Sequence, residues 1–175
     1  YCETIAGFEL PDCPGQATWF PMRDDPAKQG PLFLISGQPK TRLHGQHDDG
    51  AYSRSHKIHG REPVLIHPDD AAARGIKDGD VVEVFNQRGR CLAGARLSED
   101  VRAGCLFLWT GAWFDPDLAL DGLDRHGNPN VLTHDGKTSS LSQSPSAHSA
   151  RVDVRRWEGE VPPVQAFEPP AFKVG

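Results

Sequence analysis

Short runs of apolar residues, each bounded by glycine, proline, asparagine or aspartate, constrain this chain more than any other feature of its sequence. The clearest run is Leu-Phe-Leu-Ile at 32–35, which lies between Pro31 and Gly37 and predicts a strand buried on both faces. Further runs of strand type lie at 64–66, 81–85, 91–97, 105–109 and 151–155. Because short strands joined by compact turns are typical of barrels, we predict a mainly β fold, a closed β-barrel with short helices and long polar loops.

One short helix is expected to begin near Pro68. Asp69 and Asp70 fall in its first turn, where negative charge is favoured by the helix dipole, and Gly75 is placed to end it.

The distribution of proline divides the chain into three parts. Residues 1–30 contain four prolines among scattered aromatic residues, which predicts an extended segment packed on the barrel. Residues 31–157 form the barrel domain, and residues 158–175 form a Pro-rich tail that wraps back or hangs free. Because the chain starts at Tyr1 and not at methionine, we expect it to be an excerpt of a longer polypeptide.

Composition excludes several classes of partner. The formal net charge of −5 argues against binding to nucleic acid or to an anionic membrane surface, so neither is expected as a partner. No apolar run is long enough to cross a bilayer, which predicts no membrane insertion. The four cysteines lack the spacing of a zinc site or of a disulfide scaffold, so we expect them to be reduced and the chain to be cytoplasmic, a Cys2–Cys13 bridge being the alternative.

The loop directly after the first apolar run is rich in hydrogen-bonding side chains. Glycines in it let the backbone approach a ligand, proline stiffens it, and the arginine offers a planar fork of donors suited to phosphate or to a pterin-like edge. These residues predict a site for a polar, anionic ligand, while a well-capped surface loop with an exposed arginine is the alternative. The candidate residues are Ser36, Gly37, Gln38, Pro39, Arg42, His44 and Gln46.

A second polar region runs from 110 to 149 with no periodicity, which is uncommon in a compact domain unless the segment binds something. We interpret it as the second half of the same site, and a disordered Ser-rich loop fits the composition equally well. Its candidate amide and hydroxyl groups belong to Asn128, Asn130, Thr138, Ser139 and Gln143.

Histidines at 44, 47, 56 and 59, with Asp48 and Asp49, raise the question of a divalent metal. A metal site needs several ligands held by a rigid frame, and these residues lie in polar loops, so we predict no metal ligand in this chain.

Seven sequence blocks, taken in order, resemble the C-terminal dinucleotide-binding domain of the dimethyl sulfoxide reductase family of molybdenum enzymes. The resemblance covers residues 1 to 157 and is closest to the branch of biotin sulfoxide reductase and trimethylamine N-oxide reductase. The blocks are QPKTRLH (38–44), HGREP (59–63), HPD (67–69), GDVV (79–82), GAWFDP (111–116), GNPNVLT (127–133) and SQSPSA (142–147).

This resemblance implies a double-psi β-barrel that closes over a bis(molybdopterin guanine dinucleotide) cofactor carrying molybdenum. It implies that the two sets of candidate residues above contact the cofactor, with His44 acting as a donor and not as a base. It also implies that the metal ligand lies in an upstream domain, so that no residue of this chain is catalytic. The expected role is to hold the cofactor in an oxotransferase that reduces S-oxides or N-oxides, with the upstream domains of the same polypeptide as partners.

Two alternatives remain open at this point. The same type of barrel serves as a protein-interaction module without cofactor in unrelated proteins, and fold alone does not fix function. An export signal on a preceding segment would place the parent enzyme in the periplasm instead of the cytoplasm.

Overall fold

A computed structural model of the chain describes residues 3–142, 144–146 and 149–169. The strands are β1 (Leu32–Ile35), β2 (Pro63–Ile66), β3 (Val81–Phe85), β4 (Arg90–Leu97), β5 (Cys105–Leu108), β6 (Pro116–Asp117), β7 (Leu123–Asp124) and β8 (Arg151–Arg156). The helices are α1 (Glu3–Ala6), α2 (Pro26–Gln29), α3 (Ala51–Ser55) and α4 (Pro68–Ala72), with two 3-10 helices, η1 (Leu118–Leu120) and η2 (Pro129–Leu132).

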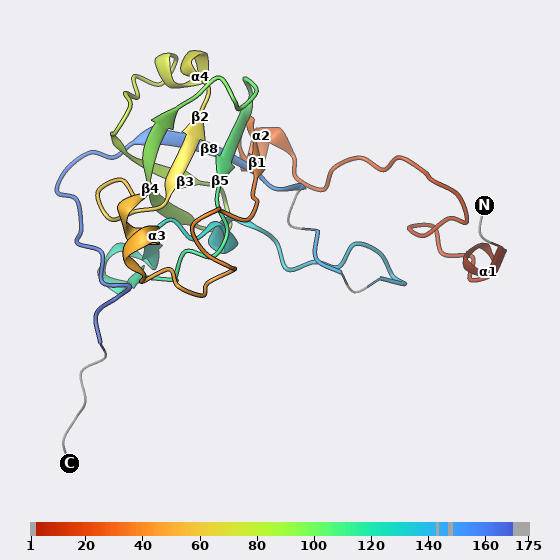
Figure 1. The fold of residues 1–175 in the computed structure, drawn as a ribbon. Helices are drawn as coiled ribbons and strands as arrows, with labels where there is room; N and C mark the ends of the chain where they lie inside the picture. The colour runs from red at the N-terminus through yellow and green to blue at the C-terminus, as the bar shows by residue number, and fades with distance from the viewer. Residues whose placement is uncertain (1–2, 143, 147–148, 170–175) are drawn as a thin grey trace.

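Six strands close into a ring in the order β2-β5-β1-β8-β3-β4, and β4 pairs back with β2 (Figure 1). The pairs β1–β5 and β2–β4 are parallel, whereas β2–β5, β1–β8, β3–β4 and β3–β8 are antiparallel. This is a closed, mainly β barrel of the double-psi type with few short helices, which confirms the predicted fold class. The closure leaves these strands without a free edge between them.

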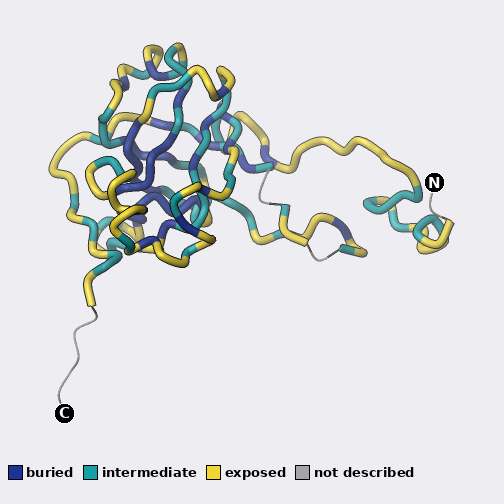
Figure 2. Tube along the Cα trace, viewed as in Figure 1, coloured by how far each residue is buried: buried dark blue, intermediate teal, exposed yellow. Residues whose placement is uncertain are grey.

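The core fills the inside of the ring, where the strands are darkest in Figure 2. It is made mostly of branched aliphatic side chains, with the small residues Cys91, Ala93 and Ala95 contributed by β4. Fully or almost fully buried members include Leu34, Val64, Ile66, Val82, Val84, Leu106, Leu108 and Val152.

The predicted helix is present as α4. Pro68 stands at its first turn, and the His67 side chain caps it by accepting a hydrogen bond from the Asp69 backbone N–H at 3.2 Å. Regular structure also appears where none was predicted, because β6, η1, β7 and η2 lie within residues 116–132. Each is only two to four residues long, too short to produce a periodic pattern in the sequence.

The two ends of the chain behave differently. Residues 24–30 lie on the barrel, where Asp24 pairs with Arg88 at 2.6 Å and accepts from the Arg151 backbone N–H at 2.7 Å. Residues 3–23 extend away from the barrel beside the loop of residues 134–146 (Figure 1). The division of the chain at residue 30 and the packing of residues 1–30 on the barrel stay predictions, and the first two residues lie outside the described part. The tail from 158 to 169 returns along the barrel, and the remainder of the tail is outside the described residues.

Candidate functional site

Three strand ends bring the polar segments of the sequence to one end of the barrel. β1 and β5 are parallel, with Ile35 opposite Phe107, so both strands end on the same side. β8 runs antiparallel to β1 and begins there, since the Leu34 N–H donates to the Ala150 carbonyl at 3.0 Å. Residues 36–46, residues 109–115 and the segment before β8 therefore leave the barrel at this end, which we call the polar end.

The first polar loop, residues 36–46, is fixed along the end of β5. The Ser36 hydroxyl donates to the Leu108 carbonyl at 2.8 Å, and the Thr110 N–H donates to the Gly37 carbonyl at 2.9 Å. A Cβ at Gly37 would lie 3.0 Å from the ring of Phe107, so this position requires a very small residue. The start of the loop is thus rigid without any ligand.

Gln38 and His44 form a clamp across the loop. The Gln38 side-chain oxygen accepts from the His44 backbone N–H at 3.1 Å, which places the amide nitrogen 3.0 Å from His44 Nδ1. Because the amide nitrogen can only donate, Nδ1 accepts and the imidazole proton lies on Nε2. Both side chains are exposed, so the loop presents the Nε2–H of His44 as a fixed donor. The exposed side chain of Gln46 makes no hydrogen bond with a described residue.

The segment after β5 is joined tightly to the first polar loop. Gly111 has φ +88, and a Cβ there would overlap the His44 carbonyl oxygen. The Trp113 indole N–H donates to the Gly45 carbonyl at 2.6 Å, and the Trp113 backbone N–H donates to Asp48 at 3.0 Å. The two segments therefore form one unit.

Beneath this unit lies a buried ion cluster, formed by Arg42, Asp48, Lys57 and Glu62. Arg42 lies 3.4 Å from Asp48 and 3.0 Å from Glu62, and Lys57 lies 2.8 Å and 3.0 Å from the same two carboxylates. All four side chains are at most 3% exposed. Two cations therefore neutralise two anions, which is the condition for burying charge at tolerable cost.

Arg42 was predicted to face a ligand with its guanidinium fork, but the structure turns it inward. Besides the two carboxylates, its second terminal nitrogen donates to the Thr110 carbonyl at 2.6 Å. Its terminal nitrogens are thus engaged within the protein, and Arg42 holds the first polar loop to the segment after β5.

His126 lies at the edge of the ion cluster and is fully buried. Its Nδ1–H donates to the Trp113 carbonyl at 2.9 Å, because a carbonyl can only accept. Its Nε2 is buried with no described partner. Burial and the nearby charge of Lys57 lower the pKa of His126 to about 4, so the ring is neutral near pH 7. Burial acts to raise the pKa of Asp48, but the Lys57 hydrogen bond and the charges of Lys57 and Arg42 hold that pKa below its ordinary value.

A second buried carboxylate, Asp124, organises the turn that leads to η2. It accepts from the backbone N–H groups of Asp115, Gly127 and Asn128 at 2.7–2.8 Å. Burial raises the pKa of Asp124, and these hydrogen bonds oppose the rise. The Asn128 side chain caps η2 by accepting from the Asn130 N–H at 3.0 Å, while Asn130 itself is exposed.

The other predicted residues lie in the loop that extends beside residues 3–23. The Ser139 hydroxyl accepts from the Ser142 N–H at 2.9 Å, and the Thr138 N–H donates to the Ser144 carbonyl at 2.9 Å. Gln143 is outside the described residues. Among the hydrogen bonds of the described residues, none joins this loop or Asn128 and Asn130 to the first polar loop.

A cavity of about 300 Å³ opens beside the first polar loop. Lys40 and Thr41 of the loop line it together with Tyr52 of α3, Arg96 of β4 and Trp109. The backbone N–H groups of Lys40 and Thr41 donate to no described residue. This set of cationic, neutral and backbone donors, with aromatic walls, fits a ligand that carries phosphates and hydrogen-bonding rings.

The histidines and aspartates considered as metal ligands do not converge. Within the described residues there is no group of three or more His, Cys, Asp or Glu side chains arranged to hold a metal ion. The Asp48 carboxylate is occupied by Lys57 and Arg42. No described helix is long and apolar enough to span a membrane.

Sequence reasoning did not identify Asp48, Lys57, Glu62, His126 or Asp124 as parts of the site. Their signal in the sequence is weak, because charged residues in Gly- and Asp-rich segments are usually solvated. The one available indication was that Glu62 lies two residues before the apolar run at 64–66.

A closed barrel that gathers rigid polar loops at one end defines a ligand-holding domain. The chain belongs to the family of molydopterin dinucleotide binding domains, whose family model matches residues 32–151. This confirms the family resemblance read from the sequence.

Curated relatives extend the match over almost the whole chain. Trimethylamine-N-oxide reductase of Salmonella typhi is 43% identical over 99% of this chain and 21% of its own length. Dimethyl sulfoxide/trimethylamine N-oxide reductase of Cereibacter sphaeroides is 38% identical over 97% of this chain and 21% of its own length. Biotin sulfoxide reductase of the same organism is 43% identical over 90% of this chain and 21% of its own length. The chain thus spans about a fifth of the length of the curated relatives it matches.

A solved structure shares the fold. Acetylene hydratase from Pelobacter acetylenicus superposes with a TM-score of 0.59 over 73% of this chain and 18% of its own, at 15% sequence identity.

Proposed function

We propose that this chain holds a bis(molybdopterin guanine dinucleotide) cofactor as the C-terminal domain of a molybdenum oxotransferase that reduces S-oxides or N-oxides. The observation that carries the proposal is the polar end, where a preformed loop presents fixed donors beside a cavity in a fold whose family is named for dinucleotide binding. The named relatives support the reaction class.

The first polar loop would supply direct contacts through its exposed groups. Exposed donors of this loop belong to His44, Gln46 and Gln38: the His44 Nε2–H, the Gln46 amide and the remaining amide N–H of Gln38. Such donors suit pterin ring atoms and phosphate oxygens. Ser36, Gly37 and Pro39 would shape the loop, and Arg42 would hold it from below.

The second set of residues would complete the site from the other side. Asn130 and Thr138 are exposed and their side chains have no hydrogen bond to a described residue, which makes them the better placed members of this set. Asn128 and Ser139 would act mainly by fixing turns, as their side-chain hydrogen bonds indicate. Gln143 stays a candidate on its sequence position.

The cofactor, when bound, supplies the two-electron exchange with the oxide substrate. This chain's residues would bind and orient it and hold the first polar loop in place beneath it. No residue here is proposed to be catalytic, and the metal ligand is proposed to lie in an upstream domain of the same polypeptide.

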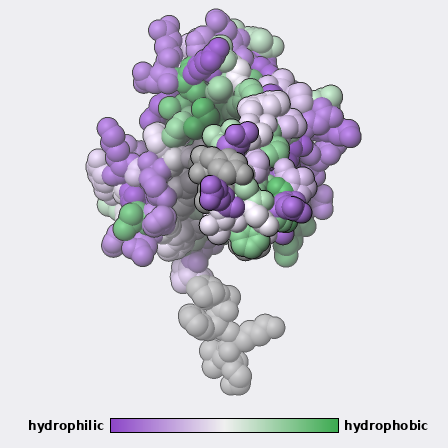
Figure 3. Space-filling view, turned by 90° about the vertical axis from the view of Figure 1, so that its right-hand side faces the viewer, coloured by the Kyte–Doolittle hydropathy of each residue, from purple (hydrophilic) through white to green (hydrophobic). Residues whose placement is uncertain are grey.

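Residues 3–23 would pack on those upstream domains. Trp19 is 82% exposed, and Phe8, Phe20 and Met22 are also exposed, which is costly for apolar side chains in water. Figure 3, which faces the side toward which this segment extends, shows apolar residues scattered among polar ones. The match of the chain to one fifth of each relative supports neighbouring domains as the cover.

We propose that the parent enzyme is cytoplasmic, in line with the free thiols of Cys13, Cys91 and Cys105. Cys2, the partner in the alternative disulfide, is outside the described residues. An export signal on a preceding segment would instead direct the enzyme to the periplasm.

The test is the cofactor content of the full polypeptide that carries this chain. Molybdenum measured by mass spectrometry and guanosine monophosphate released by acid hydrolysis should both be present in the purified protein. Gln46→Ala should lower both, whereas Gln165→Ala, an exposed glutamine on the tail, should not. A protein that contains neither component when expressed with a functional molybdopterin pathway would refute the proposal and favour the protein-interaction module.

A further inference from the structure

The C-terminal tail crosses the barrel next to the buried ion cluster and is held there at several points. The Arg61 guanidinium, itself buried, donates to the Pro162 carbonyl, and the Gln165 N–H donates to Asp115 at 2.8 Å. Val164 lies against Gly60, where an added Cβ would be 3.7 Å from the Val164 side chain. We call residues 158–169 the strap.

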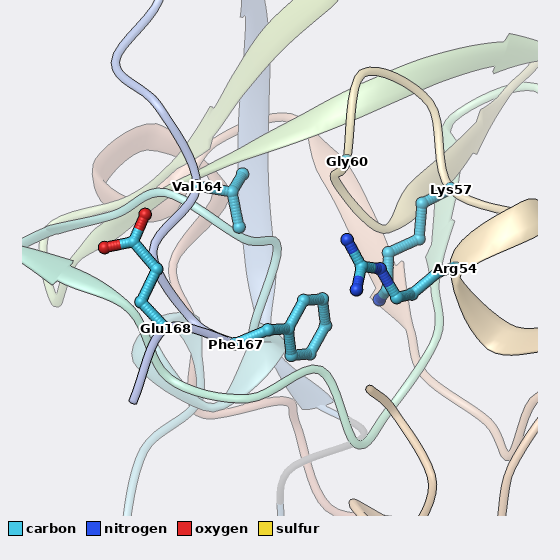
Figure 4. A pocket seen from close by; sticks show the side chains of 6 residues that line it. All are labelled: Arg54, Lys57, Gly60, Val164, Phe167 and Glu168. Atoms are coloured by element: carbon cyan, nitrogen blue, oxygen red, sulfur yellow. The ribbon is translucent and has the colours of Figure 1, made fainter. Parts of the chain in front are cut away.

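Phe167 is the side chain by which the strap reaches the ion cluster. Its ring meets Trp113 edge-on with centroids 5.4 Å apart and His126 with centroids 4.9 Å apart. The Arg54 guanidinium lies 5.3 Å and the Lys57 ammonium 5.8 Å from the ring centroid. Figure 4 shows Phe167 pointing toward both cations across a cavity of about 420 Å³. Edge contacts between rings and cations over an aromatic face are both attractive.

Three of the residues around Phe167, namely Trp113, Lys57 and His126, also help to fix the first polar loop. Trp113 donates to Gly45 of that loop, and Lys57 shares Asp48 and Glu62 with Arg42. His126 holds Trp113 through the hydrogen bond from its Nδ1–H to the Trp113 carbonyl. The Nε2 of His126 is buried with no described partner, and the His126 ring packs against the Phe167 ring. Removing the ring would open Lys57 and His126 to water, and water would compete for the carboxylates that hold Arg42.

We propose that Phe167 is a positioning residue, which anchors the strap over the buried ion cluster and thereby keeps the first polar loop in its folded shape. The strap makes this loop depend on a segment more than a hundred residues away in sequence. The effect of the strap on cofactor binding rests on the proposed function, whereas its effect on the shape of the first polar loop does not.

Hydrogen–deuterium exchange tests the strap in the full polypeptide purified from cells that make no molybdopterin, so that bound cofactor cannot mask an effect. Phe167→Ala should accelerate backbone exchange roughly tenfold in peptides covering 36–46 and 110–115, as loss of such aromatic contacts shifts local opening by about an order of magnitude. Exchange in β3 and β4 should not change. Phe167→Tyr should restore the wild-type rates, since it keeps the ring.

Val161→Ala is the matched control, because Val161 belongs to the strap but its side chain is exposed. It should leave exchange of the first polar loop unchanged. Unchanged exchange at 36–46 in Phe167→Ala, or equal acceleration throughout the barrel, would overturn the proposal. If Phe167→Ala does not fold, Phe167→Leu, which keeps an apolar cover and loses the ring, gives the same comparison.

Molybdenum content, measured on the same variants made in cells with the pathway, separates the two proposals. Faster exchange of the loop in Phe167→Ala, together with wild-type protein that lacks molybdenum, would support the strap and refute the proposed function. Normal molybdenum content in the wild type, together with unchanged exchange in Phe167→Ala, would support the proposed function and refute the role of the strap.

Discussion

His126 is expected to make the stability of this chain fall as the pH is lowered from 7 to 5. The imidazole is fully buried, it donates from Nδ1 to the Trp113 carbonyl, and its Nε2 has no described partner. Burial and the charge of Lys57 lower its pKa to about 4 from an ordinary value of 6.5. Asp48 and Asp115 oppose this change, but they do not outweigh it.

The sign follows from proton uptake in the two states. Between pH 6.5 and 4 the unfolded chain binds a proton at His126 and the folded chain does not, so acid favours unfolding. From pH 7 to pH 5 these two pKa values correspond to a loss of about 2 kcal/mol in the free energy of unfolding. The lowered pKa of Asp48 costs stability only at more acidic pH, as the pH falls toward its folded value. The raised pKa of Asp124 acts in the opposite direction, because the folded chain holds a proton there more tightly than the unfolded chain.

Urea unfolding at pH 7 and pH 5 measures this difference. His126→Asn places an amide nitrogen near the position of Nδ1, so it can still donate to Trp113 but cannot titrate, and the pH dependence should largely disappear. His47→Asn is the control: His47 is exposed and has a φ of 64, which asparagine tolerates, so this variant should keep the wild-type slope. Equal stability of the wild type at both pH values, or an unchanged slope in His126→Asn, would refute the reasoning.

Three further predictions concern closely packed positions, namely Gly111, Arg42 and Cys91. Gly111→Ala should lower the free energy of unfolding in urea by more than about 2 kcal/mol, because the added Cβ would overlap the His44 carbonyl. Gly104→Ala is the control, since Gly104 has a similar φ but open space around it, and it should cost about 1 kcal/mol. Equal costs would contradict the overlap. Arg42→Ala should lower the free energy of unfolding by about 3–5 kcal/mol, because it leaves two buried carboxylates with one cation. The control Lys40→Ala should lower it by less than about 0.5 kcal/mol. A small cost for Arg42→Ala would show that the cluster is hydrated. Cys91 is buried in the core, and burial raises the pKa of its thiol. Mass spectrometry should therefore show Cys91 unmodified by thiol reagents until urea unfolds the chain. Rapid labelling in the native state would contradict its position in the core.

Several elements could be predicted from the sequence because their causes are local. β1 and β3 have the predicted limits, since each is rich in β-branched or other apolar residues and is bounded by turn residues. α4 begins at Pro68 as predicted, because its cap and its first-turn acids are neighbours in sequence. The family resemblance came from ordered blocks of sequence and needed no coordinates.

The site itself depended on contacts between distant residues. Arg42 looks like a ligand-binding arginine in a polar loop, but its partners Asp48, Glu62 and Thr110 meet it only when β2, α3 and the end of β5 come together. Buried charge is stable only where such partners converge, and convergence is a property of the closed barrel. The sequence by itself therefore determined the strands of the closed ring, the barrel class and the family. Only the tertiary structure decided which polar groups face outward to solvent and which turn inward to hold the loop.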